Sequence, residues 1–292
     1  MKPKDVVLAL SVPIIWGAGF LFAKAAIGHF PPILLMALRF SVTALILVWF
    51  VTPPFHYFHR IFWIALVSAA IQYSLTFTGL RDLDASTAII VVQLEVPFGV
   101  LLAAILLRDK IKARHVIGIT LAFLGVALIA GEPRLEGQLR PVLLVVGGAF
   151  SWALGQVMVK TLGAVGGFRL IAWVAVFASP QLFLASWLVE RDQIDAIRTA
   201  TPIVWSAVIY LGVIMTALGY GIWYHLVGKY AVNQVMPFLL LLPVTTVMGA
   251  ALVLGEKLTG ILILGGILAV TGIAIIVVTK NPFRKSVAET GE

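Results

Sequence analysis

The chain has 292 residues, of which 61% are apolar and 12% charged, and its mean hydropathy is +1.06. Soluble domains carry about 25% charged residues, so this composition excludes a soluble fold and indicates a polytopic membrane protein. The absence of cysteine excludes disulfides, thiol nucleophiles and thiolate metal sites.

Ten apolar runs are long enough to cross a bilayer, which takes roughly 20 residues of helix. Charged or Pro/Gly-rich breaks separate them, and the connections are mostly too short for a soluble domain. The whole chain is therefore predicted to be one all-α membrane domain. The predicted spans are 6–27, 31–52, 61–80, 86–107, 113–131, 141–162, 168–189, 202–227, 232–254 and 259–279.

Two sets of matching residues indicate an internal duplication, which dictates the architecture. Five pairs lie 147 positions apart: Asp109/Glu256, Lys110/Lys257, Gly118/Gly265, Ala122/Ala269 and Gly125/Gly272. Nearer the front of each half the offset is 136, in the pairs Trp16/Trp152, Gly19/Gly155 and Lys24/Lys160. Each copy contains five spans. Because this number is odd, the second copy must enter the membrane inverted relative to the first, as in many secondary transporters. The predicted units are two inverted five-helix repeats, residues 1–134 and 135–280, and a cytoplasmic tail, 281–292.

The basic residues set the expected orientation. With the amino terminus placed inside, 13 Lys and Arg lie inside and 6 outside. Positive charge is retained on the cytoplasmic side, so both termini are expected there, and the net charge of +8 calls for no nucleic-acid partner. The lack of cysteine fits a bacterial inner (cell) membrane.

The first and sixth spans carry related faces. Trp16, Phe20 and Lys24 lie four residues apart and share one helical face, and the sixth span repeats it as Trp152, Gln156 and Lys160. One interpretation is a pair of walls facing a central cavity. The other, which holds most strongly for the two lysines, is anchoring at the membrane interface.

The third and eighth spans are unusually polar. The third carries Gln72, Tyr73, Ser74, Thr76, Phe77 and Thr78, and the eighth Thr216, Tyr220, Trp223, Tyr224 and His225. Hydroxyl groups in a membrane often bond only a neighbouring helix, at about 0.6 kcal/mol each. Two matched helices of this kind favour cavity lining.

Charges inside spans are the strongest candidates for function, because each costs about 3 kcal/mol to insert. Arg39 lies in the second span, and Glu95 lies in the fourth beside Gln93 and Pro97. Prolines leave carbonyl groups unpaired, and the ninth span matches the fourth with Asn233, Gln234, Pro237 and Pro243. One interpretation of Glu95 is functional, as a proton-coupling or ammonium-binding group. The other is structural, as a partner of Arg39 or as a lining residue without a role in transport. Arg39 has a functional and a structural interpretation.

The fifth and tenth spans contain almost nothing polar. Their twin GxxxAxxG faces predict tight helix packing, either within a monomer or across a homodimer, and no substrate is expected there.

Ten spans, the inverted repeat, the WGxxF…K opening and the glycine-patterned closing helices together resemble the drug/metabolite transporter superfamily. The narrower resemblance is to its EamA-type branch, and most closely to the YddG-type aromatic amino-acid exporters, over residues 6 to 279. It implies alternating access without ATP, and the chain has no Gly-rich phosphate loop. It also implies that spans one, three, four, six, eight and nine line the cavity. No cofactor or metal is expected.

The predicted function is a secondary transporter that exports small amphipathic metabolites, aromatic or other large neutral amino acids, by alternating access. Aromatic walls would stack a ring and hold an ammonium group. Alternatives are export of lipophilic cations, a membrane-embedded enzyme, which would need a catalytic constellation, and a non-transporting scaffold. The expected partners are a small-molecule substrate and the bilayer. Glu95 and Arg39 are candidates for charge coupling, and the predicted cavity residues are Trp16, Phe20, Gln72, Tyr73, Thr76, Phe77, Gln93, Glu95, Trp152, Gln156, Tyr220, Tyr224 and Asn233.

Overall fold

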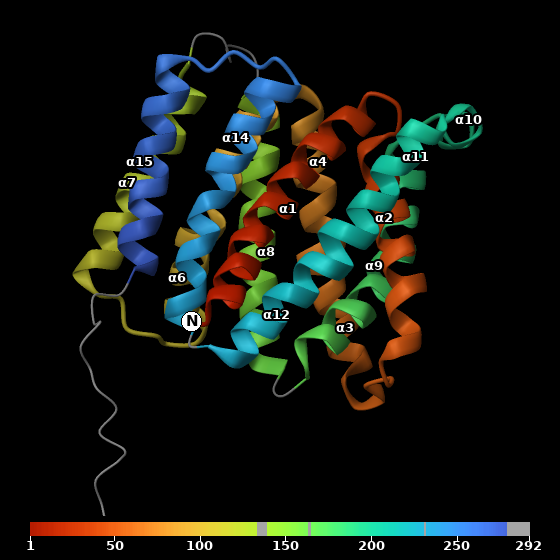
Figure 1. Ribbon diagram of the computed structural model, residues 1–292, viewed down its shortest axis with the longest axis horizontal. Helices are drawn as coiled ribbons and strands as arrows, with labels where there is room; N and C mark the ends of the chain where they lie inside the picture. The colour runs from red at the N-terminus through yellow and green to blue at the C-terminus, as the bar shows by residue number, and fades with distance from the viewer. Residues whose placement is uncertain (133–138, 163–164, 231, 279–292) are drawn as a thin grey trace, which may run out of the picture.

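The fold is a bundle of membrane-spanning helices. The computed structural model describes residues 1–132, 139–162, 165–230 and 232–278, and every regular element in these ranges is helical. Ten helices among the described residues are long and apolar enough to cross a membrane, which confirms the predicted number. Figure 1 shows them running between an upper end, near α10, and a lower end, where the amino terminus lies. The predicted boundary at residue 134 and the tail 281–292 lie outside the described residues.

Each half supplies five spans. In the first half, the first span is α1 (Pro3–Ile27) and the second is α2 (Pro32–Leu47) with η1 (Val48–Phe50). The third span consists of η2 (Phe55–Tyr57), α3 (Phe58–Ala65), η3 (Leu66–Ile71) and α4 (Gln72–Asp82). The fourth consists of α5 (Ala85–Val92) and α6 (Glu95–Leu106), and the fifth is α7 (Ala113–Ala130). In the second half, the sixth span is α8 (Leu139–Leu162) and the seventh is α9 (Gly167–Val189). The eighth consists of α11 (Pro202–Ile209), η5 (Tyr210–Leu218) and α12 (Gly219–Lys229). The ninth consists of α13 (Val232–Val235), η6 (Met236–Leu240) and α14 (Leu241–Val253), and the tenth is α15 (Gly260–Val277). The short helix α10 (Gln193–Thr199) follows α9.

The fourth and ninth spans are interrupted, as their prolines predict. Between α5 and α6 the amides of Gln93 and Leu94 bond to carbonyl groups only three residues back. The ninth span carries the 3₁₀ segment η6 between two α-helices. Glu95 therefore opens α6, in the first turn of a helix, where the helix dipole favours a carboxylate.

The third and eighth spans each contain a π-helical segment, η3 and η5, which end 147 positions apart at Ile71 and Leu218. Such segments are rare and are often found at functional sites. Their carbonyl groups accept hydrogen bonds from the neighbouring first or sixth span. Trp16 Nε1 donates to the Met215 carbonyl at 3.1 Å, and Ser151 Oγ donates to the Val67 carbonyl at 2.7 Å. Each contact joins the two repeats, one from the first span to the eighth and the other from the sixth span to the third, as the inverted repeat requires.

The glycine faces of α7 and α15 pack against each other inside one chain, at the left edge of the bundle in Figure 1. Gly118 lies against the backbone of Gly272, and Gly125 against that of Gly265. The pairing runs in reverse order, so the two helices are antiparallel, as the inverted repeat requires. Of the two arrangements that the sequence left open, the structure shows packing within the monomer.

Candidate functional site

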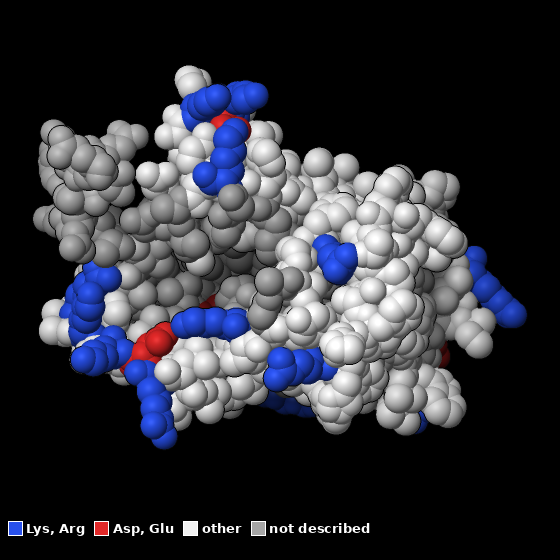
Figure 2. Space-filling model, turned by 90° about the horizontal axis from the view of Figure 1, so that it is seen from below, with Lys and Arg blue, Asp and Glu red and all other residues white. Residues whose placement is uncertain are grey.

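The lower end of the bundle is hollowed near its middle (Figure 2), and we refer to this hollow as the cavity. Midway along their spans, Trp16, Glu95 and Trp152 are only half-buried and Gln156 is exposed. Figure 2 looks at the lower end and shows its surface hollowed near the middle, with Lys and Arg side chains around it. A carboxylate or amide group within a membrane-spanning helix is costly to expose to lipid, so the exposure of Glu95 and Gln156 favours a water-filled space beside them.

Above this level aromatic packing closes the cavity. Phe20 of α1 is buried and stacks on Phe77 of α4 with ring centroids 5.9 Å apart. Phe77 stacks in turn on Tyr73 at 5.5 Å, and Tyr73 meets Phe40 of α2 at 5.0 Å. Three predicted cavity residues, Phe20, Tyr73 and Phe77, thus lie within the closed part of the molecule in this structure.

Lys24 closes the upper end of α4. Its Nζ donates to the carbonyl oxygens of Leu80, Arg81 and Leu83 at 2.9, 3.0 and 2.7 Å. These are carbonyl groups at the end of a helix, which have no partner within the helix and attract cations. Lys24 therefore joins α1 to α4 rather than pointing only at a membrane interface.

Glu256 closes the start of α5. Its carboxylate accepts hydrogen bonds from the amides of Ala85 and Ser86 at 2.7 and 3.0 Å, and from Ser86 Oγ at 2.6 Å. Free amide groups at a helix start favour an anion. The turn between α14 and α15 is thereby bound to the first repeat.

Gln72 and Thr76 of α4 face α8 and are buried. Gln72 Nε2 donates to Thr76 Oγ1 at 3.3 Å, whereas Gln72 Oε1 has no hydrogen-bond partner among the described residues. Gln93 is buried at the break between α5 and α6. The side-chain amides of Gln72 and Gln93 are thus polar groups in the interior of the bundle.

Arg39 is fully buried between α2, α4 and η5. Its Nε donates to Thr216 Oγ1 at 2.9 Å, one terminal nitrogen reaches Tyr73 Oη at 3.3 Å, and the guanidinium lies 4.7 Å from the Tyr73 ring centroid. No carboxylate pairs with it among the described residues, so the interpretation of Glu95 as its partner is wrong. Arg39 joins the two repeats.

Glu95 makes no hydrogen bond or ion pair in the part of the chain that the structure describes, and its side chain is half-buried at the start of α6.

Trp16 forms an aromatic cluster with the second repeat. Its ring lies 5.0 Å from that of Tyr220 and 6.0 Å from that of Trp223. Trp223 was absent from the predicted cavity residues, although its place on the aromatic eighth span could have indicated it. Tyr224 and Asn233 lie in α12 and α13, but their side chains are outside what the structure describes.

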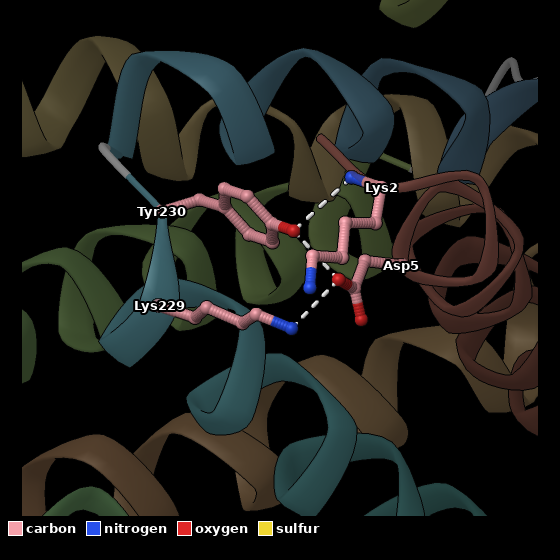
Figure 3. A network of polar contacts seen from close by, with 4 residues as sticks. All are labelled: Lys2, Asp5, Lys229 and Tyr230. Carbon is pink, nitrogen blue, oxygen red and sulfur yellow. Dashed lines mark hydrogen bonds and ion pairs between the residues drawn. The ribbon is translucent and has the colours of Figure 1, made fainter.

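A polar network at the lower end was missed by sequence reasoning (Figure 3). Asp5 is only 1% exposed and accepts hydrogen bonds from Lys229 Nζ at 2.8 Å and Tyr230 Oη at 2.6 Å. The backbone amide of Lys2 donates to the same hydroxyl group at 3.1 Å. The hydrogen bond to Asp5 raises the pKa of Lys229 above its usual value. The network binds the start of α1 to the end of α12.

Ten helices long and apolar enough to cross a membrane, five in each half of the described chain, define a multi-pass membrane protein. The model of the EamA-like transporter family matches twice, over residues 4–131 and 139–278. The chain belongs to this family, and it is a transporter rather than an enzyme.

Curated relatives agree over nearly the full length. The "Probable amino-acid metabolite efflux pump" of Escherichia coli is 32% identical, with 94% of this chain and 95% of that protein covered. Its counterpart in Salmonella typhimurium is also 32% identical, with the same coverage. The "Uncharacterized transporter YvbV" of Bacillus subtilis is 30% identical over 98% of this chain and 95% of its own. A solved crystal structure at 18% identity covers 98% of this chain and 100% of its own with a TM-score of 0.66, which shows the shared fold.

Proposed function

We propose that the protein exports aromatic or other large neutral amino acids by alternating access through the cavity between its repeats. The observation that carries the proposal is the cavity itself, open at the lower end and closed by aromatic packing at the upper end. The relatives named as amino-acid metabolite efflux pumps support the substrate class. A non-transporting scaffold would need no mid-span cavity.

The excess of basic residues on one side favours a lower end that faces the cytoplasm, with both termini there, in the inner membrane of a bacterium. Each predicted unit, 1–134 and 135–280, then forms one inverted half of the transport path. In this orientation the cavity opens to the cytoplasm, which is the state in which an exporter takes up its substrate.

The walls of the cavity fit an amphipathic amino acid. Trp16 and Tyr220 pack together, and half-buried Trp152 of α8 would form the opposite wall. Their rings would hold an aromatic side chain and an ammonium group. Gln156 offers donors and acceptors for the polar end, and Asn233 and Tyr224 come from the spans that would complete the wall.

Side-specific thiol labelling tests this path, because the natural chain has no cysteine. Gln156→Cys is expected to react with a membrane-impermeant maleimide from the cytoplasmic side, and tryptophan should slow the reaction. The control is Ile267→Cys, at a mid-span position on α15 whose side chain is 59% exposed on the apolar outer surface; it should stay unreactive. Equal labelling of Gln156→Cys with and without tryptophan would remove this cavity from the substrate path.

Export of lipophilic cations is the second candidate function, and it is favoured by Glu95. A half-buried carboxylate without a partner among the described residues is suited to a cationic substrate. Glu95→Gln is expected to lower cation transport into proteoliposomes at least about tenfold, since a charge-assisted contact is lost. Transport of neutral amino acids should stay within about twofold. An equal loss for both substrates would show that Glu95 does not discriminate by charge.

A further inference from the structure

The turns that follow α6 and α14 are two copies of one structure. Arg108 and Gly255 both have positive φ angles, 59° and 68°. In the next residue the amide of Asp109 bonds to the Ala103 carbonyl at 3.3 Å, and the amide of Glu256 to the Ala250 carbonyl at 3.2 Å. Asp109 and Glu256 therefore project from equivalent turns at opposite ends of the molecule.

The two carboxylates nevertheless have different partners. Glu256 is bound to the amides at the start of α5, and beside it Lys24 is bound to the carbonyls at the end of α4. We call Lys24 and Glu256 the upper pair. At the lower end Asp109 and Lys160, the lower pair, bind each other instead at 2.9 Å, with Lys160 62% and Asp109 53% exposed.

The equivalent partners for the lower pair exist in the second repeat. The corner between α4 and α5, where the upper pair binds, corresponds at an offset of 147 to the corner between α12 and α13. Leu83, whose carbonyl accepts from Lys24, corresponds to Tyr230. The Asp5 network joins Lys229 and Tyr230, at the end of α12, to the start of α1 (Figure 3).

We propose that Lys160 and Asp109 are positioning residues of the transport cycle that bind the α12–α13 corner when the cavity closes at the lower end. In that state Lys160 donates to carbonyl groups at the end of α12, and Asp109 accepts from the amide groups that open the ninth span. The upper pair is released at the same time. The inference rests on the proposed function, because it assigns residues to the reorientation step of the same cavity.

The present ion pair is the resting arrangement of the lower pair. An exposed bridge between two long side chains adds little stability, so its loss costs little. The contacts formed on closure are charge-assisted bonds to helix ends, which are stronger than the exposed bridge. Each pair thus favours closure of its own end.

Distances between spin labels on the full-length protein in lipid nanodiscs test this exchange. Labels at Arg81 and Leu258 report the upper end, and labels at Thr161 and Gln234 report the lower end; all four positions are exposed. Glu256→Gln is expected to raise the ratio of upper-open to lower-open molecules about tenfold. Adding Asp109→Asn should reverse most of that shift. Asp195→Asn, an exposed acid on α10, is the control for the change in charge and should reverse none.

No reversal by Asp109→Asn in the Glu256→Gln protein would overturn the proposal, as would a simultaneous widening of both ends. The readout needs no substrate, so the gate and the proposed function can fail separately. Reciprocal distances without amino-acid transport would contradict the function alone. If the protein transports amino acids but neither Glu256→Gln nor Asp109→Asn changes the distances between the labels, the roles proposed for the two pairs are wrong and the proposed function stands.

Discussion

Adding a single methyl group at Gly125 is expected to destabilise the protein by about 1–3 kcal/mol, the usual cost of overpacking. A Cβ atom there would lie 2.5 Å from the Gly265 carbonyl oxygen and 2.7 Å from the Ala269 amide nitrogen. Both are backbone atoms, so α7 and α15 would have to separate along their seam. Thermal unfolding of Gly125→Ala in detergent measures the effect.

Gly260→Ala is the matched control, because it adds the same methyl group to α15 with no heavy atom within 4 Å. Gly260 is the first residue of α15, so the interior helix preference of alanine does not apply in full and the variant should be about as stable as the parent. If Gly125→Ala also unfolds at or above the parent temperature, the seam does not need its close backbone approach.

Arg39→Ala is expected to cost about 3 kcal/mol, since it removes a large buried side chain and leaves polar partners without their donor. Arg39 contacts Thr216 of η5 and Tyr73 of α4, so the loss loosens the contact between repeats. Arg39→Lys should fall between the parent and Arg39→Ala, because one ammonium group cannot reproduce the planar fork.

Arg81→Ala serves as the control for Arg39, as this arginine is exposed, and its unfolding temperature should barely change. If Arg39→Ala is equally stable but inactive in transport, Arg39 acts on the substrate or a coupled ion, and the structural interpretation fails. Thermal unfolding and uptake assays on the same preparation separate the two outcomes.

Much of the fold could be predicted because its signals are local or periodic. The spans follow from apolar length, and the α7–α15 seam follows from two glycine faces at one offset. The prolines of the fourth and ninth spans indicated irregular backbone, and each of these spans is interrupted in the structure. The third span begins earlier than predicted, since α3 starts at Phe58 and aromatic side chains extend the helix towards the interface.

The state of the cavity could not be predicted. Phe20 and Gln156 hold equivalent positions in the two repeats, yet Phe20 is buried and Gln156 exposed, and nothing in their local sequence indicates the difference. Contacts between residues far apart in the sequence could not be predicted either. Nothing local shows that Asp5 meets Lys229 or that Arg39 turns to Tyr73 and Thr216 rather than Glu95.

Counterflow into proteoliposomes tests the central claim, export of aromatic amino acids, most directly. Vesicles containing purified protein would be loaded with unlabelled tryptophan, phenylalanine, threonine, glutamate or a lipophilic cation, with labelled tryptophan outside. The account predicts transient accumulation of label in vesicles loaded with tryptophan or phenylalanine and none in those loaded with glutamate. Accumulation driven by the cation alone, or by no compound in the panel, would contradict it.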